Sequence, residues 1–96
     1  FEEARELYAL VHATYTELLP ASQLQHAQAA NNLGWAERNL GDLEAAERHL
    51  RESVESFRAA HPEPHPLRAD YQSNLALVLK ARGRGALLEA LISVNA

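Results

Sequence analysis

The sequence of 96 residues contains no cysteine, and it has only four glycines and four prolines. The absence of cysteine excludes disulfides and thiolate chemistry and is compatible with a reducing compartment. Long apolar runs are absent too, because no stretch approaches the roughly 20 residues that a membrane-spanning helix needs. No basic-then-apolar signal segment is present. These absences favour a small, soluble, helix-rich and cytoplasmic protein that does not contact a membrane.

Positive charge is scarce, since nine Lys and Arg stand against thirteen Asp and Glu and the net charge is −4. A dedicated nucleic-acid-binding protein normally presents a basic face, so direct nucleic-acid binding is not expected. The one basic cluster, Lys80, Arg82 and Arg84, fits the cations that the dipole favours at a helix C-terminus. The sequence also lacks a glycine-rich phosphate loop, a nucleophile elbow and a zinc-binding helix motif. We therefore expect no enzyme activity and no cofactor.

The sequence repeats weakly with a period of 42 residues. This shift aligns FEEARELY (1–8) with LEAAERHL (43–50), and Asn32-Leu33 with Asn74-Leu75. It also aligns Pro20 with Pro62 and Gly41 with Gly83. The matching positions are turn residues and small core residues, which indicates a structural repeat.

Each repeat unit reads as two helices. Ser22 and Gln25 form a capping box, and the helix that follows ends at Gly41, where Asp42 starts the next helix. Helical spacing predicts two buried faces, the first formed by Leu33, Ala36 and Leu40 and the second by Leu43, Ala46, Leu50, Val54 and Phe57. The proline-rich HPEPHP (61–66) ends this helix, and a third helix runs from Pro66 through Leu75, Ala76 and Leu79 to Gly83. The final GALLEALISVNA predicts a short, covered helix.

Four features together resemble the tetratricopeptide repeat. They are NNLG (31–34), a glycine eight residues after Leu33, the LEAAE opening of the next helix and HP in the inter-unit loop. The similarity is to the 42-residue variety of kinesin light chains and many bacterial regulatory proteins. It implies an all-α fold of stacked antiparallel helical hairpins in a right-handed α-solenoid of about 2 to 2.5 repeats. A single domain over 1–96 would contain the second helix of one repeat (1–19), a second repeat (22–60) and a degenerate third repeat (66–96). Because the chain starts at Phe1 inside a helical pattern, we expect it to be a fragment of a longer protein.

The resemblance also implies a concave groove, lined by the first helix of each repeat, that holds a peptide or protein segment. Carried over by position, the groove residues of the first unit are Gln28, Asn31, Asn32, Trp35, Arg38 and Asn39. Those of the next unit are Asp70, Ser73, Asn74, Leu77, Lys80 and Ala81. Helical spacing independently places the first set on one face. Asn side chains can donate to and accept from a peptide backbone, and Trp35 offers a flat apolar anchor.

Several of these positions have a second interpretation. Asn32 and Asn74, which recur at the period, either contact a ligand or hydrogen-bond between neighbouring helices. Trp35 either lines the groove or packs in the core. Glu37 stands where the family has a large apolar residue, so either a shifted helix exposes its carboxylate or Trp35 fills the vacated space.

The remaining charged groups have ordinary interpretations. His61, Glu63 and His65 in the proline loop are a weak metal-site candidate, and we expect no metal there. His12, His26 and His49 read as surface or half-buried side chains. Four carboxylates lie on the second helix of this unit: Glu44, Glu47, Glu52 and Glu55. We interpret them as a solvated face with weak ion pairs to Arg48, Arg51 and Arg58.

Two functions fit the sequence. The first is a non-catalytic protein-interaction module that binds a peptide or partner segment in the groove. The alternative is a structural or self-associating regulatory segment of a larger bacterial signalling or transcription-regulator protein. In that case the exposed end helices would mediate homo-oligomerisation.

Overall fold

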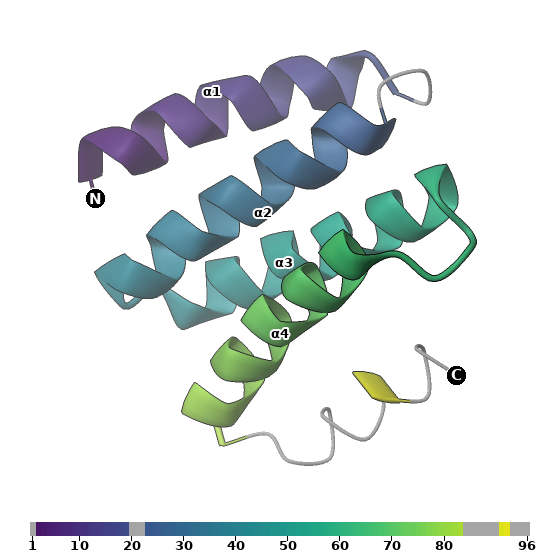
Figure 1. Ribbon diagram of the computed structural model, residues 1–96. Coiled ribbons are helices and arrows are strands. Elements are labelled where there is room, and N and C mark those ends of the chain that lie inside the picture. The colour runs from purple at the N-terminus through teal and green to yellow at the C-terminus, as the bar shows by residue number, and fades with distance from the viewer. Residues whose placement is uncertain (1, 20–22, 84–90, 93–96) are drawn as a thin grey trace.

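The computed structural model describes residues 2–19, 23–83 and 91–92, and four helices account for most of them. They are α1 (Glu2–Glu17), α2 (Gln23–Leu40), α3 (Leu43–Ala60) and α4 (Pro66–Ala81). Successive helices pack against each other, and α2 also contacts α4 (Figure 1). The described part of the chain contains no strand, so the predicted all-α helical repeat fold is confirmed. None of the described helices is long and apolar enough to cross a membrane.

Local sequence signals set the helix ends. Gly41 adopts a φ of 86°, which side-chain-bearing residues rarely reach, and Asp42 caps α3 by accepting a hydrogen bond from the backbone N–H of Ala45 at 3.4 Å. Gly83 has a φ of 70°, so the turn after α4 begins in the same way as the turn after α2. The prolines at 62 and 64 lie in the loop between α3 and α4, and Pro66 opens α4 behind the N-cap His65.

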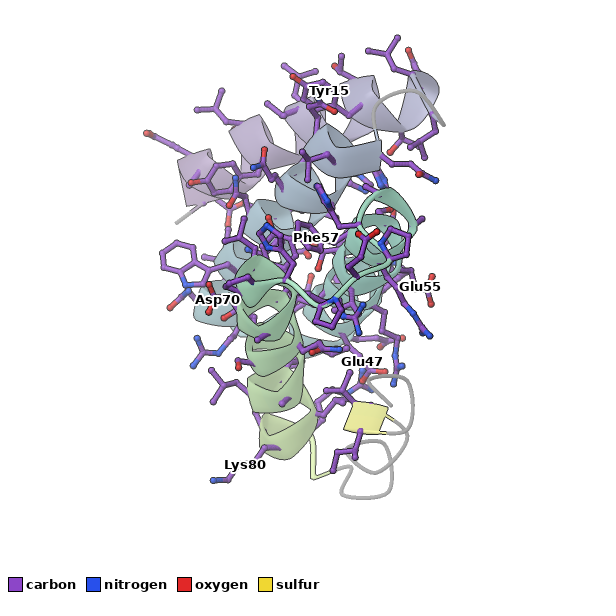
Figure 2. All side chains as sticks on the ribbon, turned by 45° about the vertical axis from the view of Figure 1, so that its right-hand side comes forward. Tyr15, Glu47, Glu55, Phe57, Asp70 and Lys80 are labelled. Atoms are coloured by element: carbon purple, nitrogen blue, oxygen red, sulfur yellow. The ribbon has the colours of Figure 1, made fainter. Side chains whose placement is uncertain are left out.

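The core forms where α2, α3 and α4 meet. Phe57 lies at its centre (Figure 2), within a cluster of Ala27, Ala46, Leu50, Val54, Tyr71, Leu75, Val78 and Leu79. Leu40, which was expected on the buried stripe of α2, is instead exposed beside the Gly41 turn. Leu43 packs on the core only partly buried. Ser22 lies outside the described residues, and so does most of the predicted last helix. Leu91 of that segment is described, and it packs against the core.

Helices α2 and α3 approach closely at Gly34, which has no side chain. A Cβ atom at Gly34 would lie 2.6 Å from Cγ of Leu50 and 3.3 Å from the carbonyl oxygen of Ala46. Such distances are far inside van der Waals contact, so only glycine fits at this crossing. This crossing holds α2 closely against α3, while α1 and α4 pack on other parts of the α2 surface.

Candidate partner-binding site

The predicted binding residues lie away from the core on α2 and α4. Their helical spacing places them on one side of each helix, and none of them is buried. The residues are Gln28, Asn31, Asn32, Trp35, Arg38, Asn39, Asn74, Leu77 and Lys80. We refer to these nine residues as the α2/α4 face. Asp70 and Lys80 project from the same side of α4, whereas Glu55 projects from α3 on the opposite side of the molecule (Figure 2). Ser73 and Ala81, the other predicted groove positions, are exposed as well.

A side-chain hydrogen bond joins the two helices of this face. Asn74 Nδ2 donates to Asn31 Oδ1 at 3.0 Å, and both side chains are partly buried. The structural interpretation of the asparagines therefore holds for Asn74, with Asn31 and not Asn32 as its partner. Asn32 is exposed, and its side chain makes no hydrogen bond within the described part of the chain.

Trp35 lies at the surface. Its exposed fraction is 39%, so the side chain is not enclosed in the core. One turn along, Asn39 Nδ2 donates to the Trp35 carbonyl oxygen at 2.8 Å, so this amide already bonds to its own helix.

Glu37 follows neither of the two expected outcomes. It is only 5% exposed, and its carboxylate pairs with His49 Nδ1 of α3 at 2.6 Å. A buried carboxylate is costly unless it is paired. The histidine supplies that partner across the hairpin, so α2 has no need to shift and Trp35 does not fill the space.

The expectation of ordinary half-buried histidines is wrong for His26, which is 2% exposed. His12 and His49 are side by side, with ring centroids 5.0 Å apart, and His12 lies 5.1 Å from the His26 ring. Three histidines from three helices therefore form one group. Sequence spacing gave no sign of it, because each residue belongs to a different helix.

Glu47 also departs from the expected solvated face. It is buried, and it accepts hydrogen bonds from Arg51 at 3.3 Å and from Arg82 at 3.0 Å. Arg82 thus ties the end of α4 to α3 instead of acting only as a helix-end cation. Glu44 and Glu55 are exposed, as expected.

The proline-loop histidines have structural contacts. The rings of His61 and His65 each lie 5.2 Å from Phe57, and His65 Nδ1 accepts a hydrogen bond from the Leu67 N–H at 3.1 Å. Among the described residues, these two histidines and Glu63 do not form a group of converging ligand atoms.

One ionisable group beside the α2/α4 face is perturbed. Burial raises the pKa of Tyr71, and the neighbouring Asp70 carboxylate raises it further. Among the described residues, one hollow lies between α4 and residues 91–92 and is lined in part by the predicted groove residue Ser73, and another lies between α3 and Arg82. None of the nine residues of the α2/α4 face lines either of these hollows.

A family model described as tetratricopeptide repeat matches residues 26–67. The matched segment runs from the first turn of α2 through α3 to the start of α4. Comparison with the curated proteins gave no match, and comparison with the solved structures gave none either.

Proposed function

We propose, on the premise that residues 26–67 are a tetratricopeptide repeat, that the chain binds a peptide or a segment of a partner protein along the α2/α4 face. Tetratricopeptide repeats are generally protein-interaction modules and generally non-catalytic. The observation that most supports the proposal is the exposure of Trp35 next to carboxamides on the same face of α2. Apolar aromatic surface of this kind is unusually favourable at interfaces.

The chemistry of the face suits an extended polypeptide. Gln28 and Asn32 are exposed, and each offers a donor and an acceptor that can pair with backbone groups whatever the partner's side chains. Leu77 of α4 is 46% exposed and adds a second apolar side chain to the face. The two charged residues of the face, Arg38 and Lys80, are cationic, and the Asp70 carboxylate lies on the same side of α4 as Lys80.

Selection from a displayed peptide library tests this function. Peptides that bind the wild-type chain are selected, and their affinities are then measured for Asn32→Ala, Trp35→Ala and the control Glu55→Ala on the opposite side. Loss of an aromatic anchor is expected to weaken binding about tenfold or more, with a smaller loss for Asn32→Ala and none for the control. Peptides that bind all four proteins equally would show that the binding surface lies elsewhere.

A second candidate function is self-association through α1. No residue of α1 is buried, and Leu7 and Leu10 are 63% and 64% exposed. With Val11 they form an apolar stripe at helical spacing on α1, and Leu18 is exposed in the turn that follows. In a regulatory segment of a larger protein, this stripe would pack on a second copy or on another part of the same protein.

Light scattering over a roughly hundredfold concentration range distinguishes this candidate from peptide binding. Self-association predicts a mass that rises with concentration and a Leu10→Glu variant that stays monomeric, while peptide affinity at the α2/α4 face is unchanged. If the wild-type chain is monomeric throughout the range, self-association of this chain by itself is ruled out.

A further inference from the structure

Two histidines and a glutamate from three helices direct their polar atoms to one place. His12 Nε2 of α1 lies 2.9 Å from Glu52 Oε1 of α3, and His26 Nε2 of α2 lies 2.8 Å from the same oxygen. The ligand atoms of the three residues all lie within 4.8 Å of one another. This cluster is on the α1 side of the hairpin, and none of its residues belongs to the α2/α4 face.

The buried histidine of the cluster has an incomplete hydrogen-bond arrangement. Its Nδ1 is within 2.8 Å of the Ser56 hydroxyl, one turn after Glu52 on α3. Its Nε2 is buried and, although Glu52 Oε1 is near, has no aligned hydrogen bond within the described residues. A buried nitrogen left without an aligned partner is costly. A cation placed among the three side chains would bond both Nε2 of His26 and the carboxylate.

From this geometry we propose that His12, His26 and Glu52 form a binding site for a divalent transition-metal ion of the zinc type. Imidazole nitrogen and carboxylate oxygen are ligands that zinc accepts, with bonds of about 2.0–2.2 Å. Tetrahedral geometry at that bond length places ligand atoms roughly 3.3–3.5 Å apart. The two nitrogen–oxygen distances of 2.8 and 2.9 Å therefore need to open by only about half an ångström.

The surroundings meet two further requirements of a metal site. Ligating histidines generally use their second ring nitrogen for an outer hydrogen bond that fixes the ring, and Ser56 occupies that position at His26. An ion also needs a path from solvent. Glu52 provides it, because its side chain is 33% exposed while His26 closes the inner side. Three protein ligands leave one coordination position for water.

Metal binding would join α1 to the α2–α3 hairpin. No residue of α1 is buried, so the apolar packing that holds this helix is limited. His12 supplies a contact from α1 to α3, through Glu52. An ion held by all three helices would stabilise α1 in its docked position and would be linked to folding.

Calorimetric titration of the metal-free chain with zinc chloride tests the proposal. We expect about one zinc per chain, with at least roughly tenfold weaker binding for His12→Ala and for Glu52→Gln. Matched controls are His61→Ala in the proline loop and Glu44→Gln on the exposed part of α3, and both should bind zinc as the wild type does. These ligand variants avoid the buried His26, whose replacement could impair folding. Zinc binding that is absent, or equally strong in the ligand variants and the controls, would overturn the proposal.

Hydrogen exchange provides a readout specific to this place in the fold. Zinc should slow amide exchange in α1 of the wild type, and chelation should reverse the effect. The same zinc concentration should leave α1 exchange unchanged in His12→Ala. Protection that appears equally in this variant would mean that zinc acts at another site and would contradict the assignment.

Discussion

Asn31 of α2 accepts a hydrogen bond at 3.0 Å from Asn74 of α4 and so ties these two helices together. The two asparagines that recur at the 42-residue period, Asn32 and Asn74, are therefore not equivalent. Asn74 contributes to packing between α2 and α4, whereas the Asn32 side chain is exposed.

Replacing the two recurring asparagines should have different effects on stability. Asn74→Ala removes a partly buried hydrogen bond and should lower the free energy of unfolding by about 0.5–1.5 kcal/mol. Asn32→Ala removes an exposed side chain and should change it by less than about 0.5 kcal/mol. Urea unfolding monitored by circular dichroism measures both values. Equal losses in the two variants would mean that the Asn31–Asn74 bond contributes nothing.

The buried pair Glu37–His49 should respond asymmetrically to mutation. His49→Ala leaves the Glu37 carboxylate buried without a partner and should cost about 2–4 kcal/mol. Replacing Glu37 by Leu in the same His49→Ala chain removes the buried charge, so the double variant should be more stable than the single one. Thermal and urea unfolding of the three proteins provide the comparison. A double variant less stable than His49→Ala would show that the carboxylate is stabilised by something other than this histidine.

The helix boundaries were predictable because their signals are local. Gly41 and Asp42 mark the turn between α2 and α3, and Pro66 marks the start of α4. Each of these residues acts through its own backbone conformation or through groups a few residues away. The apolar spacing of α3 likewise predicted its buried residues, with Phe57 at the centre.

The polar partners were missed because they are distant in sequence and belong to no periodic pattern. The turn at Gly41 indicates that α2 and α3 are antiparallel neighbours, so a partner for Glu37 was to be sought on α3. The turn alone does not single out His49, which pairs with Glu37 in the structure. The Asn31–Asn74 bond and the contact of His12 with Glu52 also depend on how α1 and α4 pack on the α2–α3 hairpin, which local patterns do not specify.

The α2–α3 crossing should not tolerate a methyl group. Gly34→Ala places Cβ 2.6 Å from Leu50 Cγ and should destabilise the chain by about 1–3 kcal/mol, despite the better helix propensity of Ala. A double-mutant cycle with Leu50→Ala measures the effect, because the smaller side chain makes room for the methyl group. The combined variant should lose less than the sum of the two single losses. Strict additivity would contradict a direct clash.

Alkaline pH should destabilise the fold partly through Tyr71. Burial raises the pKa of this phenol in the folded chain above its ordinary value of 10.0, so the unfolded chain loses the proton first. Between the two pKa values the unfolded state binds fewer protons. The stabilisation from Tyr71 is therefore complete below pH 10.0 and is lost as the pH rises through the folded pKa.

Tyr71→Phe keeps the ring next to Phe57, whose centroid is 5.3 Å away, and removes the ionisable hydroxyl. Unfolding free energies at about pH 8.5 and about pH 10.5 should therefore differ less in this variant than in the wild type. Identical alkaline losses in wild type and Tyr71→Phe would rule out the contribution.

The most direct test of partner binding uses the fluorescence of Trp35, because the chain contains one tryptophan. A selected peptide that lacks tryptophan is titrated into the chain while calorimetry records binding independently. Binding on the α2/α4 face buries the exposed ring, so the emission should shift to shorter wavelength and saturate with the same Kd as the heat. Saturable heat with an unchanged emission spectrum would place the partner elsewhere and contradict the account.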